Sequence, residues 1–248
     1  MHNDTGRSLQ VSFALPKDDS IPDFLDRRPF VGTFTNLNTF RSVCEHQFYR
    51  RYIKKDQPYV ETDAMKFGNE VHSAFEHRLG DNRKPLPDTL REYEHFAYPF
   101  DKYKVLVEQK LGMTAKATQT GYWDSDVWFR GKADAVVLQL EKGMAFIADW
   151  KTGSAKFEDP FELATNALLL KMRYPELKKV VGSYAWLKEN RMSQQYDVSD
   201  FKRTFVEIQR LMNLTADKRV SGEWIKRKSG LCGFCPVSDC ENWYEAKK

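Results

Sequence analysis

Two strand-like segments joined by a short turn constrain the fold of this chain more than any other feature. Residues 126–140 (DVWFRGKADAVVLQL) alternate in polarity and are rich in valine, and residues 144–152 (MAFIADWKT) follow after a Glu-Lys-Gly turn. Two such runs around a short turn with glycine are typical of an antiparallel β-hairpin. The first segment carries Asp134, and the second ends on Asp149 and Lys151. We therefore expect a hairpin that holds two acids and a lysine.

The charged residues of this hairpin are placed to lie together. Side chains alternate between the faces of a strand, so Asp149 and Lys151 point one way and Trp150 points the other way. Asp134 on the paired strand would be a near neighbour of Asp149. Adjacent carboxylates repel unless a proton or cation lies between them, and Mg²⁺ binds carboxylate oxygens. The alternative is a structural ion pair between Asp149 and Lys151, with Asp134 on the surface.

The rest of the chain predicts an α/β domain. Apolar residues at helical spacing occur in five segments, which are residues 36–55, 65–79, 88–111, 159–175 and 199–214. Residues 180–187 read as a buried strand. Helices, a hairpin, a helix, a strand and a helix in this order indicate a mixed sheet flanked by helices. We expect residues 1–33 to form a flexible N-terminal arm and residues 34–248 to form one domain.

The four cysteines have a spacing that suits a metal site. Cys44 stands alone, whereas Cys232, Cys235 and Cys240 form a C-x2-C-x4-C pattern. Four thiolates complete a tetrahedral zinc site or a cubane iron–sulfur cluster. A shared site would join the segments 36–55 and 229–245. The alternative is that Cys44 is a buried helix residue unrelated to the other three.

Basic residues gather at the end of the segment 36–55, although the net charge is only +4. We expect these side chains to line a path for DNA, with two tyrosines free to stack on bases. The residues are Arg50, Arg51, Lys54, Lys55, Tyr49 and Tyr52. A solvated helix face is the alternative interpretation of such a charge run.

Three motifs resemble, in order, those of the PD-(D/E)XK nuclease superfamily. FGNEVHSAFEHRL resembles its helix histidine motif, GKAD its G-x-x-D motif and DWKTG its D-x-K motif. One early cysteine and three late ones resemble the iron–sulfur nucleases of its RecB-like branch, which include CRISPR-associated RecB-like exonucleases and AddB-type nuclease domains. The resemblance covers roughly residues 35–245 and implies a restriction-endonuclease-like core with its ends joined by a metal cluster.

The resemblance also implies roles for individual residues. Lys151 corresponds to the catalytic lysine, and the ligands of Mg²⁺ or Mn²⁺ correspond to His72, Asp134, Asp149 and the backbone carbonyl of Trp150. Glu108 is a weaker candidate ligand, because some members use an acid before the first core strand; its alternative is an exposed acid at a helix end. The four cysteines correspond to ligands of a 4Fe–4S cluster, with structural Zn²⁺ as the alternative.

The helix after the D-x-K motif departs from the family pattern. Family members often have Gln-Leu-x-x-x-Tyr there, whereas this chain has Glu162 and Asn166 at the two polar positions. The resemblance implies that these two residues face DNA. Glu162 also fits a capping box with Asp159, which is the structural alternative.

Together these features predict a stand-alone, divalent-metal-dependent DNA nuclease, and within that class an exonuclease that acts on ends or single strands. DNA recombination, repair, CRISPR or phage processing would supply its substrates and protein partners; the oligomeric state is not predicted. No membrane-length apolar run and no secretion-signal layout occur, so we expect a cytoplasmic protein. The alternatives are a non-catalytic iron–sulfur adaptor that binds DNA and a zinc-stabilised RNA-processing nuclease.

Overall fold

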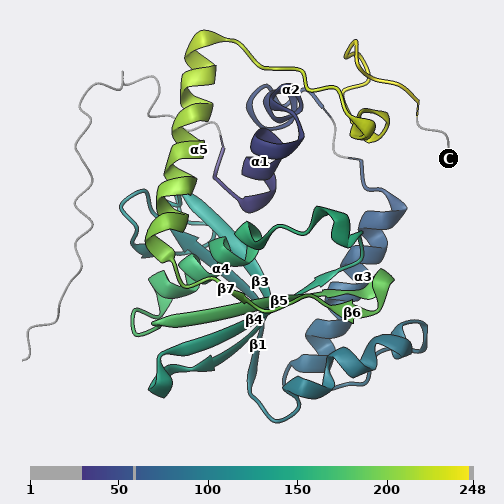
Figure 1. The fold of residues 1–248 in the computed structure, drawn as a ribbon, viewed down its shortest axis with the longest axis vertical. Helices are drawn as coiled ribbons and strands as arrows, with labels where there is room; N and C mark the ends of the chain where they lie inside the picture. Colours follow the sequence, from purple (N-terminus) through teal and green to yellow (C-terminus); the bar gives the residue numbers. More distant parts are fainter. Residues whose placement is uncertain (1–29, 58–59, 246–248) are drawn as a thin grey trace, which may run out of the picture.

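A mixed β-sheet forms the centre of the computed structural model, which describes residues 30–57 and 60–245 (Figure 1). The strand order is β2-β1-β3-β4-β5-β6, and β7 pairs with β5. The strands are β1 (Val105–Met113), β2 (Gln119–Thr120), β3 (Phe129–Gln139), β4 (Met144–Lys151), β5 (Lys179–Trp186), β6 (Arg191–Met192) and β7 (Tyr196–Asp197). The β4 and β5 strands run parallel and the other pairs run antiparallel, so the expected mixed sheet is confirmed.

Helices cover both faces of the sheet and define two hydrophobic cores. The α-helices are α1 (Phe34–Asn38), α2 (Glu45–Phe48), α3 (Asp63–Leu79), α4 (Pro160–Arg173) and α5 (Phe201–Ser221). The α3 helix packs on one face through Val71 and Phe75. The α4 and α5 helices supply the core of the other face, where Leu163 and Ile208 are fully buried. The α/β class is therefore confirmed.

The hairpin predicted from the sequence is present. The β3 and β4 strands pair antiparallel, with Ala135 opposite Ala148. The turn between them ends at Gly143, whose φ of 63° is a left-handed conformation that glycine adopts without strain. The α4 helix then carries the chain from β4 to the parallel strand β5. Asp134 and Asp149 are the next residues on their strands beyond the Ala135–Ala148 pair, so the fold brings the two acids together.

The predicted helix over residues 88–111 is wrong. Two short 3₁₀ helices, Asp88–Phe96 and Tyr98–Phe100, are followed by strand β1. Pro99 interrupts the helical pattern because it lacks a backbone N–H donor. The strand then pairs with β3 over most of its length, with Val105 opposite Val137. Glu108 therefore lies on a strand and not at a helix end.

The predicted helix over residues 36–55 is also interrupted. The α1 and α2 helices alternate with two π-helical turns, Thr39–Val43 and Tyr49–Ile53. Cys44 lies at the break before α2, with an extended backbone and its N–H bonded to the carbonyl of Thr39. The expected helix-interior position of this cysteine is therefore wrong, and the break turns Cys44 into the N-cap residue of α2.

Only the last part of the expected flexible arm is described. Gly32 bridges to the start of β3: its N–H donates to the Trp128 carbonyl at 2.9 Å, and its own carbonyl accepts from the Arg130 N–H at 2.9 Å. This end of the arm is therefore bonded to the sheet, and residues 1–29 lie outside the described residues. Among the described helices, none is long and apolar enough to span a membrane.

Candidate active site

A histidine and two acids from three different elements meet beside the sheet. His72 lies on α3, Glu108 on β1 and Asp134 on β3. The Nδ1 atom of His72 is 3.2 Å from Oδ1 of Asp134 and 3.7 Å from Oε1 of Glu108. All three side chains offer a ligand atom within 4.8 Å of the others. This donor set, one imidazole and two carboxylates, is suited to a divalent metal ion.

Glu108 has an unusual backbone at this point. Its φ is 49°, which is a left-handed conformation that a residue other than glycine rarely adopts. Such strained positions persist where the surrounding structure holds them, and they cluster at active sites. The β1–β3 register passes from Val107–Ala135 to Gln109–Ala133, so the strained residue lies beside Asp134. The geometry places Glu108 beside His72 and Asp134, in the group that could hold a metal ion.

Asp134 and Asp149 are both buried beside the lysine-bearing end of β4. The Oδ2 atom of Asp134 accepts a hydrogen bond of 3.0 Å from the Trp150 N–H, which fixes this carboxylate against the neighbouring strand. The Oδ1 atom of Asp149 lies 2.7 Å from Nζ of Lys151. The same nitrogen lies 2.8 Å from Oε2 of Glu162 on α4. Lys151 is therefore held between two carboxylates, next to the group of His72.

Two buried atoms of this site lack a hydrogen-bond partner among the described residues. They are Nδ1 of His72, whose near neighbour is Oδ1 of Asp134 at 3.2 Å, and Oδ1 of Asp149, whose near neighbour is the charged Nζ of Lys151 at 2.7 Å. Buried polar atoms are nearly always bonded, and an exception calls for an explanation such as an ion. The imidazole of His72 and the carboxylates of Glu108 and Asp134 fit a divalent cation, whereas the predicted ligand Asp149 lies outside the set that meets within 4.8 Å.

Burial and the nearby carboxylates shift the pKa values of His72 and Asp149. Burial lowers the pKa of His72, but the carboxylates of Asp134 and Glu108 outweigh this effect and raise the pKa to about 10. Burial raises the pKa of Asp149 above its ordinary range against the effect of Lys151, and the charge of Asp134 raises it further. The site therefore draws a positive charge, here a proton on His72, and a metal ion would displace that proton.

Trp150 faces away from the acids, as the alternation predicted. Its ring stacks on Phe75 of α3 at 4.2 Å between centroids and meets the edge of Phe100 at 6.0 Å. Its side chain is 1% exposed. The ring therefore anchors β4 against α3, while the proposed role of its carbonyl as a metal ligand stays a prediction.

Lys132 is a neighbour of the site that the sequence did not reveal. It forms an ion pair with Glu108, and this contact leaves Glu108 one carboxylate oxygen directed toward His72. Lys132 stands two residues before Asp134 in the GKAD motif. A charged residue at an alternate position of an otherwise apolar strand was the signal available, because such residues rarely occur without partners.

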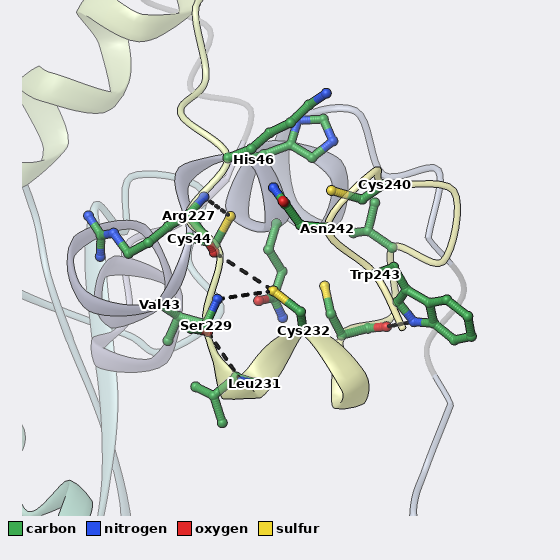
Figure 2. A pocket seen from close by; sticks show the side chains of 14 residues that line it. Val43, Cys44, His46, Arg227, Ser229, Leu231, Cys232, Cys240, Asn242 and Trp243 are labelled. Atoms are coloured by element: carbon green, nitrogen blue, oxygen red, sulfur yellow. Dashed lines mark hydrogen bonds between the residues drawn. The ribbon is translucent and has the colours of Figure 1, made fainter. Parts of the chain in front are cut away.

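The four cysteines line one pocket between the first helices and the C-terminal segment (Figure 2). Backbone N–H groups point at two of the sulfurs: Arg227 donates to Cys44 at 3.4 Å, and Ser229 donates to Cys232 at 3.3 Å. Figure 1 shows the same juxtaposition, with the C-terminal segment beside α1 and α2. The fold thus brings Cys44 to the three late cysteines, although they are far apart in sequence.

No three thiols of this pocket lie within 4.8 Å of one another in the described residues. In residues 30–57 and 60–245, the only three-residue set of possible ligand atoms within 4.8 Å of one another is the group of His72, Glu108 and Asp134. Zinc bound tetrahedrally at about 2.3 Å would hold its sulfurs only ~3.8 Å apart. Burial raises the pKa of Cys235, so this thiol is protonated at neutral pH unless a cation binds it.

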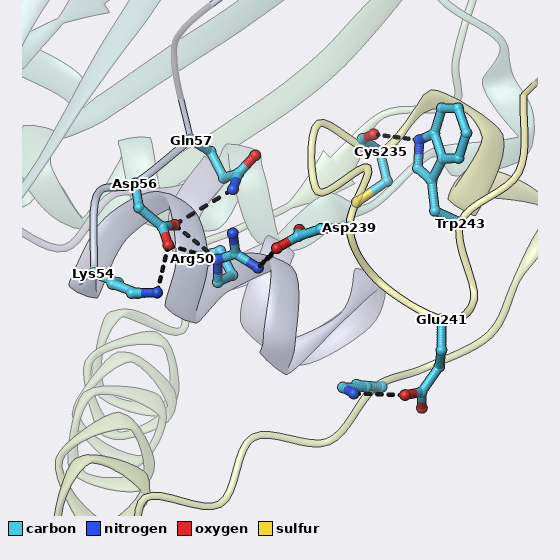
Figure 3. Close-up of polar contacts among 9 residues, drawn as sticks. Arg50, Lys54, Asp56, Gln57, Cys235, Asp239, Glu241 and Trp243 are labelled. Atoms are coloured by element: carbon cyan, nitrogen blue, oxygen red, sulfur yellow. Dashed lines mark hydrogen bonds and ion pairs between the residues drawn. The ribbon is translucent and has the colours of Figure 1, made fainter.

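Most residues predicted to line a DNA path have partners within the protein (Figure 3). Arg50 pairs with Asp56 at 2.8 Å and with Asp239 at 2.9 Å. Lys54 also pairs with Asp56, at 2.7 Å. The Arg50–Asp239 pair joins the helical turn Tyr49–Ile53 to the C-terminal segment, whereas the contacts with Asp56 are local.

The two tyrosines of this turn are not free platforms for bases. Tyr49 stacks on Trp224 at 5.1 Å between centroids, and Tyr52 packs against Phe48 at 5.5 Å. Arg51 lies over the Tyr52 ring at 5.4 Å. Lys55 is exposed and has a positive φ of 56° at the end of the turn. Of the four basic residues, Arg51 and Lys55 form no ion pair within the described part of the chain, and Arg51 has only the contact with the Tyr52 ring.

Of the two α4 residues predicted to face DNA, Glu162 lies at the candidate active site and Asn166 is buried. Glu162 contacts Lys151, and Asp159 caps the helix by accepting from the Phe161 N–H at 3.0 Å. The carboxylate of Glu162 is therefore part of the active-site group. Asn166 is 4% exposed and its amide donates to the Lys132 carbonyl at 3.4 Å. This burial leaves Asn166 without an exposed amide for DNA.

Comparison with known proteins identifies the superfamily. A sequence profile of the PD-(D/E)XK nuclease superfamily matches residues 33–240, and the chain belongs to this superfamily. Its mixed seven-stranded sheet flanked by helices is consistent with a restriction-endonuclease-like fold. No curated protein matches the chain significantly.

Two solved structures are similar to the chain over most of its length. The crystal structure of SSO0001 is 15% identical, with 88% of this chain and 90% of that chain covered and a TM-score of 0.45. A crystal structure described as a "putative exonuclease" from Eubacterium rectale is 10% identical, with 90% and 92% covered and a TM-score of 0.48.

Proposed function

We propose that this protein is a divalent-metal-dependent DNA nuclease, and that it acts as an exonuclease in recombination, repair, CRISPR or phage DNA processing. Membership of the nuclease superfamily implies a nucleic-acid substrate. One observation carries the proposal: His72, Glu108 and Asp134 meet within 4.8 Å. This group lies beside Asp149 and Lys151, so metal ligands and a cationic side chain share one site.

The chemistry assigns a part to each residue. His72, Glu108, Asp134 and Asp149 would hold Mg²⁺ or Mn²⁺, and the metal would supply a Lewis acid for phosphodiester hydrolysis. Lys151 offers a fixed positive charge, because the carboxylates of Asp149 and Glu162 outweigh the effect of burial and raise its pKa. A fixed cation beside the scissile phosphate stabilises the charge that develops during attack.

We further propose that the four cysteines hold a 4Fe–4S cluster. The single pocket that all four cysteines line supports this assignment. Backbone N–H groups directed at Cys44 and Cys232 support it as well, because hydrogen bonds to sulfur are a means of tuning such clusters. The cluster would fasten the C-terminal segment to the first helices.

The test is a cleavage assay with Mn²⁺ on end-labelled single-stranded DNA, double-stranded DNA and RNA. We expect Lys151→Ala and Asp149→Ala to abolish cleavage, and the exposed Lys188→Ala to leave it unchanged. Equal cleavage by the wild type and both site variants would refute the assignment. Preference for RNA would replace the DNA substrate, and binding without cleavage by the wild type would favour an adaptor.

A further inference from the structure

An exposed tryptophan is stacked on an arginine at the start of strand β3. Trp123 is 72% exposed, although it is a large apolar side chain. The guanidinium of Arg130 lies 4.4 Å from the Trp123 ring centroid and 4.6 Å from the Tyr122 ring centroid. Arg130 also donates to the Tyr122 carbonyl at 3.1 Å. The arginine therefore fixes both rings and leaves the indole open to solvent.

Trp123 and Arg130, which we call the stacking platform, are connected to the candidate active site along β3. Arg130 and Lys132 are alternate residues of one strand, so their side chains leave the same face with Cα atoms roughly 7 Å apart. Gly131 between them faces α4, because a Cβ there would lie 2.6 Å from Oδ1 of Asn166. Lys132 in turn pairs with Glu108 of the metal-binding group. The stacking platform, Lys132 and the candidate metal site therefore lie in this order along β3.

The face between them is basic. Lys110 of β1 is paired with Lys132 in the sheet, and both side chains are exposed. The neighbouring acids of the Trp123 loop are exposed but hydrogen-bonded within the loop: Asp124 accepts from the Gly121 N–H at 2.8 Å, and Asp126 accepts from the Thr120 hydroxyl at 2.6 Å. Two exposed lysines therefore lie along the route, one of them paired with Glu108, and the loop acids are bonded within their own loop.

We propose that Trp123, supported by Arg130, stacks on an unpaired base of a single-stranded DNA whose phosphates pass Lys110 and Lys132 toward the active site. The proposal rests on the proposed nuclease function, because it names the strand form that reaches that site. An exposed indole stacks on a base irrespective of sequence, and Arg adds a cation–π contribution. Base pairs inside a duplex are stacked on both sides, so a single ring face of this kind selects unpaired bases.

The test measures binding separately from cleavage. Fluorescence anisotropy of labelled single-stranded and duplex DNA is followed in EDTA for the wild type, Trp123→Ala and Trp123→Phe. Tyr98→Ala removes another exposed aromatic ring, which is 58% exposed on a different element, and serves as the matched control. We expect Trp123→Ala to weaken single-strand binding roughly 5- to 100-fold, Trp123→Phe to retain most of it and Tyr98→Ala to change nothing.

A base-deletion scan identifies the stacking contact itself. Single abasic sites are placed at successive positions of the oligonucleotide, and we expect one position to weaken wild-type binding but not binding by Trp123→Ala. Unchanged single-strand affinity of a folded Trp123→Ala protein, an equal loss for duplex DNA, or an abasic effect that persists in the variant would each overturn the proposal. Wild-type protein that stacks a base but cleaves no nucleic acid would instead overturn the proposed function alone.

Discussion

Glu162 of α4 lies 2.8 Å from Lys151 of β4, between Oε2 and Nζ, and Asp149 of β4 lies 2.7 Å from the same nitrogen through Oδ1. Lys151 is 25% exposed in its side chain, so most of it is enclosed by this pair of carboxylates and the nearby ring of Tyr184. If Asp149 engages a metal ion, Glu162 becomes the remaining anion that holds the lysine in place. The residue at the family's usual glutamine position thus contacts the lysine that we propose to be catalytic.

Glu162→Ala is expected to lower kcat about 10- to 100-fold with little change in KM for DNA, because it removes the group that positions Lys151. Glu162→Gln retains a side-chain acceptor of the same size and should recover most of this loss. Steady-state cleavage with saturating Mn²⁺ measures both variants. Wild-type kcat in Glu162→Ala would refute this positioning role.

Gly131→Ala is expected to destabilise the fold by about 1–3 kcal/mol through overpacking. A Cβ at this position would lie 2.6 Å from Oδ1 of Asn166 and 2.8 Å from Cδ1 of Leu169, both on α4. At Gly153 a Cβ would meet nothing within 4 Å, so Gly153→Ala is the matched control. Urea unfolding followed by tryptophan fluorescence gives both free energies, and equal stabilities would contradict the packing argument.

Cys232→Ser is expected to abolish iron binding and to lower the melting temperature, since the cluster would join two distant segments. Purification without oxygen, iron analysis and absorbance near ~400 nm measure the cluster, and calorimetry measures Tm. Ser42→Ala, at an exposed position near Cys44, is a control that keeps all four thiols. A colourless wild type that holds zinc would replace the iron–sulfur assignment and leave the nuclease proposal intact.

Acid is expected to weaken the contact between α3 and the segment that follows it. Arg78 is 7% exposed and pairs with Glu94 and, at 2.8 Å, with Asp101. Burial opposes ionisation of Glu94, but Arg78 and the Leu86 N–H outweigh it and lower its pKa. Arg78 likewise lowers the pKa of Asp101.

Because both folded-state pKa values are depressed, the stability from these pairs is fully present above the unfolded pKa values near ~4 and is lost as pH falls through the folded ones. Arg78→Met should cost about 3 kcal/mol at pH 7 by leaving Glu94 unpaired. It should also flatten the decline in unfolding free energy between pH 5 and pH 3, within roughly the range where carboxyl groups titrate. Parallel pH profiles for the variant and the wild type would show that the arginine pairs do not control acid stability.

Sequence patterns predicted those parts of the fold whose signals are local. The β3–β4 hairpin followed from alternation and a glycine turn, and α4 followed from its Asp159 cap and Pro160 in the first turn. Strand β1 was missed because its pairing with β3 joins residues that are distant in sequence, as in the pair Val105–Val137. With β1 assigned to a helix, Glu108 had no reason to approach Asp134.

The candidate site was predictable in its residue types more than in its contacts. Asp134, Asp149 and Lys151 were singled out by their places on one hairpin, and the fold does bring them together. The partner of Lys151 on α4 was not predictable, because from the sequence alone Glu162 fits a helix-capping role equally well. The basic turn shows the converse case, since Arg50 carries a charge that the C-terminal Asp239 neutralises only in the folded chain.

The cysteine pocket also has a consequence for the order of events during synthesis. Cys44 leaves the ribosome 188 residues before Cys232, which at 5–20 residues per second is an interval of roughly 10–40 s. Throughout that time the sheet and α4 emerge while the first thiol has none of its three partners. Any inorganic group held by all four sulfurs must therefore be completed only after Cys240 has emerged, in a chain whose candidate active-site strands have already been made.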